Sequence, residues 1–81
     1  MDLGWFSKPV TVAEGIVGDF RHIMNASEAL ELLTGRWRER GSDLHRGAVR
    51  ACRFALNGNG PAESARTAFE AAALEARVLV D

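Results

Sequence analysis

The sequence has 81 residues, of which 47% are apolar and 26% charged, and its formal net charge is −1. This length fits one small domain, and the composition excludes a disordered chain. The single cysteine, Cys52, excludes an intramolecular disulfide, and no apolar run approaches the roughly 18–20 residues of a membrane span. The first eight residues also lack the pattern of a signal peptide. We therefore expect one soluble, cytoplasmic domain over residues 1–81 with no membrane partner.

The N-terminal third predicts a β-hairpin after a loose segment, residues 1–7, that carries Trp5 and Phe6. Pro9 is suited to the first position of a strand because it has no N–H to donate, and the β-branched residues that follow it favour extended backbone. Residues 14–18, EGIVG, predict a turn. Residues 19–24 predict the second strand, whose facing stays open: Phe20, His22 and Met24 share one side, Arg21 and Ile23 the other.

A first helix is expected to begin after Asn25, which can accept a hydrogen bond from an orphan N–H while Glu28 reaches back as in a capping box. Apolar residues then recur at helical spacing, which predicts that they face the core. These residues are Ala29, Leu30, Leu33 and Trp37. Gly41 is the predicted end of this helix, as a left-handed cap.

The central helix is predicted over Ser42 to Asn57, with Ser42 as its N-cap. At about 100° per residue one side of it is apolar and the other is basic. The apolar side comprises Leu44, Ala48, Ala51, Cys52 and Ala55, widened by Val49 and Leu56. The basic side comprises Arg46, Arg50, Arg53 and Asn57, with Phe54 on its flank. This helix thus offers both a core surface and a basic surface.

The segment Asn57 to Pro61, NGNGP, breaks the chain, and Pro61 suits the first position of a third helix. The buried stripe expected on that helix comprises Ala65, Phe69, Ala72 and Ala76. Residues 78–80, VLV, are too apolar to be left in water, and we expect them to form a short C-terminal strand beside the hairpin. The predicted fold is α+β: a small antiparallel sheet, made of the N-terminal hairpin plus this strand, packed by three helices.

These segments together resemble one bacterial family. They are similar to the family called domain of unknown function 982. The matching residues are PVTV at 9–12, Glu28-Ala29 with Leu33 and Trp37, Gly41, His45-Arg46, Ala51-Cys52, ALNG at 55–58, and Pro61 with Ala65-Arg66, Ala68-Phe69 and Glu75-Ala76. The resemblance covers residues 6 to 81 and implies a short stand-alone protein with no assigned activity, so no site residues follow from it. Members often carry proline after the tryptophan and glycine near position 77, where this chain has Arg38 and Arg77.

The residues predict no catalytic or metal site. His45 and Cys52, seven apart on one helix, are separated by about 10.5 Å along its axis, too far for the hydrogen bond of about 3 Å that a cysteine–histidine pair needs. Cys52 lies among alanines, which predicts an inert, buried thiol. Two histidines and one cysteine far apart in sequence lack zinc-ligand spacing. We therefore expect neither an enzyme nor a bound cofactor.

Two classes of function stay open. The first is a protein-interaction module, acting as a homodimer, with Trp5, Phe6 and Phe54 as the candidate interaction surface; a small core of roughly 3–5 kcal/mol net stability favours self-association. The second is binding of nucleic acid or another anion through a basic patch of Arg46, Arg50 and Arg53. Residues 36–53 carry six arginines against two carboxylates, a local charge of +4, whereas the rest of the chain sums to −5. The net negative charge and the absence of a nucleic-acid-binding motif favour the interaction module.

Overall fold

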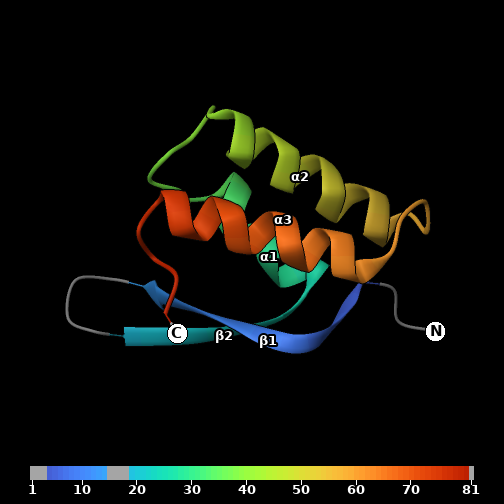
Figure 1. Ribbon diagram of the computed structural model, residues 1–81, viewed down its shortest axis with the longest axis horizontal. Coiled ribbons are helices and arrows are strands. Elements are labelled where there is room, and N and C mark those ends of the chain that lie inside the picture. The colour runs from blue at the N-terminus through green and yellow to red at the C-terminus, as the bar shows by residue number, and fades with distance from the viewer. Residues whose placement is uncertain (1–3, 15–18, 81) are drawn as a thin grey trace.

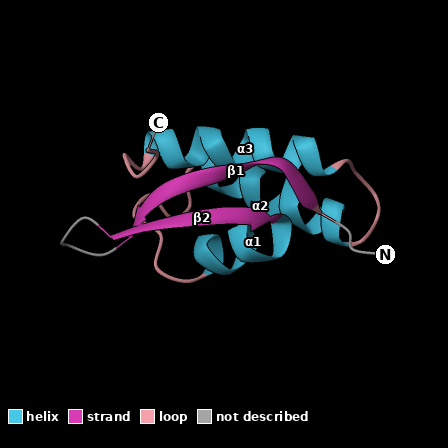
Figure 2. Ribbon diagram, turned by 90° about the horizontal axis from the view of Figure 1, so that it is seen from below, coloured by secondary structure: helices cyan, strands magenta, loops and turns pink. Residues whose placement is uncertain are grey.

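A computed structural model describes residues 4–14 and 19–80, and places a β-hairpin beneath three helices (Figure 1). The elements follow the order β1 (Trp5–Glu14), β2 (Asp19–Asn25), α1 (Ala26–Thr34), α2 (Asp43–Leu56) and α3 (Ala62–Glu75). From below, α3 lies behind β1 and α1 behind β2 (Figure 2). The predicted α+β class with three helices and an N-terminal antiparallel hairpin is confirmed.

The hairpin has one covered face and one open face. In its antiparallel register Val10 pairs with Ile23 and Thr11 with His22. Val10 and Ile23 are buried beneath the helices, whereas His22 on the opposite face is exposed. This alternation settles the facing that the sequence left open: Ile23 points to the core, and Phe20, His22 and Met24 point away from it.

β1 begins at Trp5, four residues before the strand start expected at Pro9, so residues 5–7 are extended rather than loose. The pairing is irregular between Trp5 and Val10. A proline cannot donate to a strand ladder, and such residues are confined to edges and bulges. Pro9 therefore lies within the strand at its irregular part, instead of starting it.

α1 begins as predicted but ends earlier. The Asn25 side chain accepts from the Glu28 N–H at 2.9 Å, and Glu28 Oε1 accepts from the Met24 N–H at 2.8 Å. The helix ends at Thr34 with Gly35 as its C-cap, not at Gly41. Trp37 nevertheless reaches the core, 8% exposed, from the loop that connects α1 to α2.

The apolar side of α2 faces the core at most of the predicted positions. Ser42 is its N-cap, accepting from the His45 N–H at 3.1 Å. Ala48, Cys52 and Ala55 are buried. Leu44 is the exception: it was expected in the core and is 44% exposed.

α3 buries the four residues predicted for its stripe, together with Ala73. Two hydrogen bonds close its C-terminus: the Arg77 N–H donates to Leu74 O at 3.1 Å and the Val78 N–H to Ala73 O at 3.0 Å. This is a Schellman motif, whose left-handed position is usually glycine. Here that position is Arg77, with φ 60°.

Residues 78–80 lie beside the hairpin as expected, but a third strand is not shown among the described residues, whose sheet has two strands. Residues 78–80 instead make a single isolated bridge, in which Leu79 pairs with Val12. Ala13 N–H donates to Val78 O at 2.7 Å and Val80 N–H to Thr11 O at 2.9 Å. Because the Schellman motif occupies the Val78 N–H, only a short stretch of chain is left to pair with β1 within the described residues.

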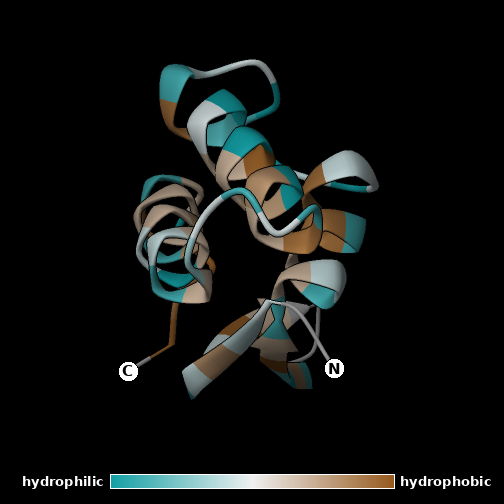
Figure 3. Cartoon of the chain, turned by 90° about the vertical axis from the view of Figure 1, so that its right-hand side faces the viewer, coloured by the Kyte–Doolittle hydropathy of each residue, from teal (hydrophilic) through white to brown (hydrophobic). Residues whose placement is uncertain are grey.

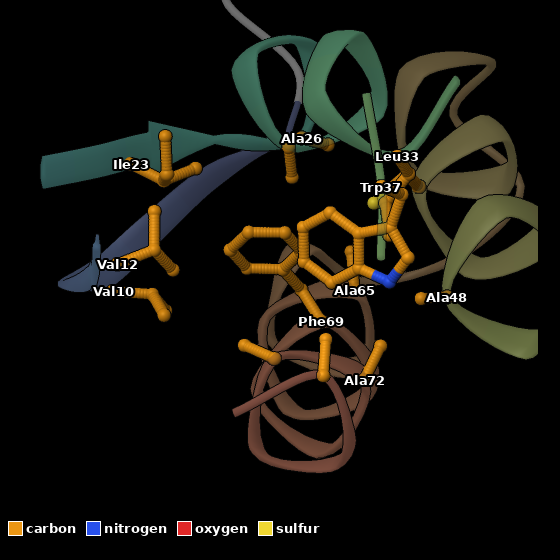
Figure 4. Close-up of a cluster of buried hydrophobic side chains, with 14 of the residues drawn as sticks. Val10, Val12, Ile23, Ala26, Leu33, Trp37, Ala48, Ala65, Phe69 and Ala72 are labelled. Atoms are coloured by element: carbon orange, nitrogen blue, oxygen red, sulfur yellow. The ribbon is translucent and has the colours of Figure 1, made fainter. Parts of the chain in front are cut away.

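The core lies where the three helices meet the covered face of the hairpin (Figure 4). Phe69 is its largest fully buried side chain, and the rings of Trp37 and Phe69 are 5.7 Å apart. Trp37 Nε1 is buried and has no hydrogen-bond partner in the described part of the chain. Alanines make up most of the remaining core, which lets the helices approach closely around this aromatic pair.

Candidate functional site

The basic surface predicted on α2 is present. Arg46, Arg50 and Arg53 are all exposed on the side of the helix opposite Ala48 and Cys52. In Figure 3 the ribbon of α2 alternates between hydrophilic and hydrophobic residues, as in an amphipathic helix. The helical period alone brought these three guanidinium groups onto one surface.

A cavity that the sequence did not predict lies along this surface. It has a volume of about 540 Å³ and combines four arginines with an apolar wall. We call it the arginine groove; its principal lining residues are Arg40, Arg46, Arg50, Arg53, Val49 and Phe54. Arg40 comes from the loop before α2, so the groove exists only because that loop folds back beside the helix.

Two of the four arginines in the groove are held by the protein itself. Arg40 Nη1 donates to Gly35 O at 2.8 Å, and Arg46 forms an ion pair with Asp43 one turn earlier on α2. Arg50 and Arg53 have no hydrogen bond or ion pair within residues 4–14 and 19–80. The groove therefore presents at least two guanidinium groups whose donors have no partner among the described residues.

His45 also lines the groove and is 8% exposed. Its Nε2 lies 2.7 Å from Leu33 O, and its Nδ1 lies 3.2 Å from the Gly41 nitrogen. A carbonyl only accepts and an amide N–H only donates, so the ring is the neutral tautomer with its proton on Nε2. The imidazole thus ties α2 to both ends of the loop that carries Arg40, which is a structural task rather than a catalytic one.

Cys52 is fully buried, and burial raises the pKa of its thiol to about 11. The thiol is therefore protonated at neutral pH and unsuited to nucleophilic attack. No group of histidine, cysteine and carboxylate residues in the described ranges could hold a metal ion. Likewise, no helix formed by these residues has the length and apolar character needed to cross a membrane.

The three aromatic residues predicted as an interaction surface differ in exposure. Trp5 and Phe54 are each 49% exposed, but Phe6 is partly buried and packs against the core. Only Phe54 belongs to the arginine groove. The structure adds two apolar residues that the sequence left unassigned, Phe20 at 62% exposure and Met24 at 42%. Both lie on the open face of the hairpin.

These observations define the class of the protein: a small α+β domain with a hairpin open on one face and a basic groove on its central helix. Residues 8–80 match the family described as "Protein of unknown function (DUF982)". The chain belongs to this family, which confirms the resemblance found from its residues.

A solved structure supports the fold. The NMR structure of the Agrobacterium tumefaciens protein Atu1219, a structural genomics target, is similar with a TM-score of 0.77 and 37% sequence identity. The match covers 96% of this chain and 77% of that chain. A search of curated proteins found none that matches.

Proposed function

We propose that this protein is a non-catalytic protein-interaction module that forms a homodimer through β2, the outer strand of its hairpin, with Phe20 and Met24 of the open face at the contact. The observation that carries this proposal is the exposure of Phe20 and Met24 on the same face of β2, on either side of His22. No described element covers that face (Figure 2). A cytoplasmic location is part of the same proposal, because a lone buried cysteine suits a reducing compartment.

The edge of β2 supports the choice of this surface. β2 pairs with β1 on one side, and no described strand pairs with its other side, although the Met24 N–H already donates to Glu28 Oε1. An unpaired edge beside an apolar face is a template for a second strand. In an antiparallel pair of β2 strands centred on His22, Phe20 of each copy would lie opposite Met24 of the other. Sulfur–aromatic contacts of this kind contribute about 0.3–1.5 kcal/mol each.

Phe54 is a poorer centre for a two-fold dimer. A two-fold interface brings the same surface of both copies together. Around Phe54 that surface contains Arg50 and Arg53, so the contact would place arginines against arginines. Such like charges in an interface cost several kcal/mol. Self-association is therefore assigned to the hairpin, and the arginine groove is left free for a different ligand.

Light scattering during size-exclusion chromatography tests the proposal. The wild-type protein should show a mass of twice the 8.8 kDa chain at micromolar concentrations. The double variant Phe20→Ser, Met24→Ser should be monomeric, since both changes are on exposed positions and leave the core intact. Leu74→Ser, a change at a 67% exposed leucine on α3, is the matched control and should remain dimeric. A wild-type monomer throughout the micromolar to submillimolar range would refute the homodimer.

A second candidate function is binding of nucleic acid or another anion through Arg46, Arg50 and Arg53. The observation in its favour is that these arginines gather along one open groove beside Val49 and Phe54. Nucleic-acid binding predicts an affinity for duplex or single-stranded oligonucleotides that falls steeply with salt. Fluorescence anisotropy at two salt concentrations measures it, and an unchanged signal at low salt would contradict it.

A further inference from the structure

We propose that the arginine groove is a binding site for a small organic anion: a carboxylate, phosphate or sulfonate attached to an apolar body. This inference is independent of the homodimer, which uses the hairpin on the other side of the molecule. It is supported by the charge of the groove, its apolar wall and the bonds that hold its shape.

The charge of the groove selects an anion. Four guanidinium groups line it, and the ion-pair partner described for them is Asp43, bonded to Arg46. Arg50 and Arg53 are three residues apart and so project from neighbouring positions on one side of α2. Two planar guanidinium groups with unused donors suit the oxygens of a carboxylate, phosphate or sulfonate, because each can donate two parallel hydrogen bonds.

The apolar wall selects an anion with a hydrophobic part. Val49 is partly buried, and Phe54 has 49% of its surface exposed beside the arginines. Small-molecule sites have volumes of roughly 300–1,000 Å³ and combine apolar walls with a few polar groups. The volume of about 540 Å³ lies within that range. A ring or short alkyl chain on Phe54 and Val49 would leave its acidic group next to Arg50 and Arg53.

The groove is held in shape without a ligand. His45 joins Leu33 O at 2.7 Å and the Gly41 nitrogen at 3.2 Å, which fixes the connecting loop against α2. Arg40 bonds Gly35 O within the same loop. On the other side of the helix start, Ser42 Oγ donates to Glu75 Oε1 at 2.5 Å, which joins α2 to α3. The backbone of the groove is therefore fixed before a ligand binds, and the ordering cost falls on the side chains of Arg50 and Arg53.

The distribution of charge favours a small anion over a long polyanion. Residues 36–53 carry a charge of +4, whereas the other residues carry −5. A nucleic acid or a long acidic peptide would extend past the groove onto this acidic remainder of the surface. Charges repel over about 8–10 Å at physiological ionic strength. A ligand confined to the groove meets mainly the positive charge, since Asp43 is the carboxylate paired with its arginines.

The probe for this site is 8-anilinonaphthalene-1-sulfonate, an aromatic sulfonate whose fluorescence rises in an apolar environment. It should bind the folded wild-type protein at one site per chain. Arg50→Gln and Arg53→Gln should each weaken binding by about tenfold or more, since a hydrogen bond to a charged group contributes about 1.5–3 kcal/mol. Arg38→Gln is the matched control, because it removes the same charge from an exposed position in the connecting loop, outside the groove.

A neutral analogue separates the two halves of the site. N-Phenyl-1-naphthylamine lacks the sulfonate, so it should bind more weakly than the sulfonate and respond equally little to Arg50→Gln and Arg38→Gln. Replacement of Phe54 by Ser should weaken both compounds. Backbone amide shifts in an NMR titration with the sulfonate should concentrate on α2 and the connecting loop.

Three results would overturn the proposal. The first is sulfonate binding that Arg50→Gln, Arg53→Gln and Arg38→Gln reduce equally, which would mean attraction by net charge only. The second is displacement of the sulfonate by a single-stranded oligonucleotide at lower concentration than by free aromatic carboxylates or phosphates, which would assign the groove to nucleic acid. The third is loss of binding in the Phe20→Ser, Met24→Ser variant, which would place the probe on the hairpin. The first two results do not depend on whether the chain is dimeric.

Discussion

Arg77 has a backbone conformation that favours glycine. Its φ of 60° lies in the left-handed region, where an L-residue is disfavoured by roughly 1–2 kcal/mol. The chain contains its own comparison at the end of α2. There Gly58, φ 77°, occupies the equivalent position: its N–H donates to Ala55 O, and the Asn59 N–H donates to Phe54 O at 2.8 Å. The two helices thus end in the same motif, once with glycine and once with arginine.

We expect Arg77→Gly to stabilise the protein by about 0.5–1 kcal/mol, the relief of strain less the entropy that glycine gains in the unfolded chain. Urea unfolding measures the change. Arg77→Ala removes the same charge but keeps a Cβ, so it should bring no gain. Gly58→Ala is the reciprocal control and should destabilise by about 1 kcal/mol. Equal stability of Arg77→Gly and Arg77→Ala would show that the left-handed backbone is not the cause.

At the scale of elements, a carboxylate links the start of β1 to the start of α3. Glu63 Oε2 accepts from the Ser7 N–H at 2.8 Å, and its Oε1 accepts from Arg66 Nε at 2.9 Å. These bonds, the backbone one first, lower the pKa of Glu63 from its ordinary 4.5. The ionised form is thus favoured in the folded protein, and this carboxylate helps to hold the two elements together.

This shift predicts how stability changes with acid. The contribution of Glu63 is complete above about pH 4.5, where the group is ionised in both states, and is lost as pH falls through its lower folded pKa. Wild type should therefore be more stable than Glu63→Gln at neutral pH, and the difference should shrink progressively below pH 4.5. Urea titrations across that range measure it. Glu70→Gln leaves the Ser7 contact in place and is the control; a wild-type-to-Glu63→Gln difference independent of pH would contradict the assignment.

The elements show which features sequence reasoning can and cannot reach. Helix caps are local, so Asn25 and Ser42 were predicted correctly. Trp37 comes four residues after Leu33, a spacing that predicts the same helix, yet it lies in the loop after Gly35. The prediction failed because spacing cannot distinguish a helix from a loop that returns to the core. The short strand expected at residues 78–80 is reduced to a single bridge for a similar reason: the left-handed turn at Arg77 decides where the chain goes next.

At the scale of the whole molecule, one part of the candidate site could be predicted from the sequence and another part could not. The three arginines of α2 were predicted, since a single helix determines that they share a face. The groove was not, since it needs Arg40 from a loop whose path is fixed by tertiary contacts of His45. The exposure of Phe20 and Met24 also depended on knowing which hairpin face the helices cover. Sequence identifies the chemistry of a surface, whereas its shape follows from packing between elements.

Cys52 provides a measure of how cooperatively the whole molecule opens. It is fully buried in the core cluster to which all three helices contribute, and its pKa of about 11 leaves negligible thiolate in the folded state at neutral pH. A thiol reagent should therefore modify the native protein only through opening of the core. When opening and closing are fast relative to labelling, the labelling rate follows the population of the open form.

The labelling rate should consequently track stability across the variants. Arg77→Gly, far from Cys52 in sequence, should slow labelling by about two- to fivefold if it stabilises by about 0.5–1 kcal/mol, and Gly58→Ala should speed it by a similar factor. Ellman's reagent with absorbance detection measures the rate, and labelling in concentrated urea gives the rate of the open thiol. Rapid modification of the native wild type, or rates that ignore both substitutions, would mean that Cys52 is reached by a local fluctuation of α2.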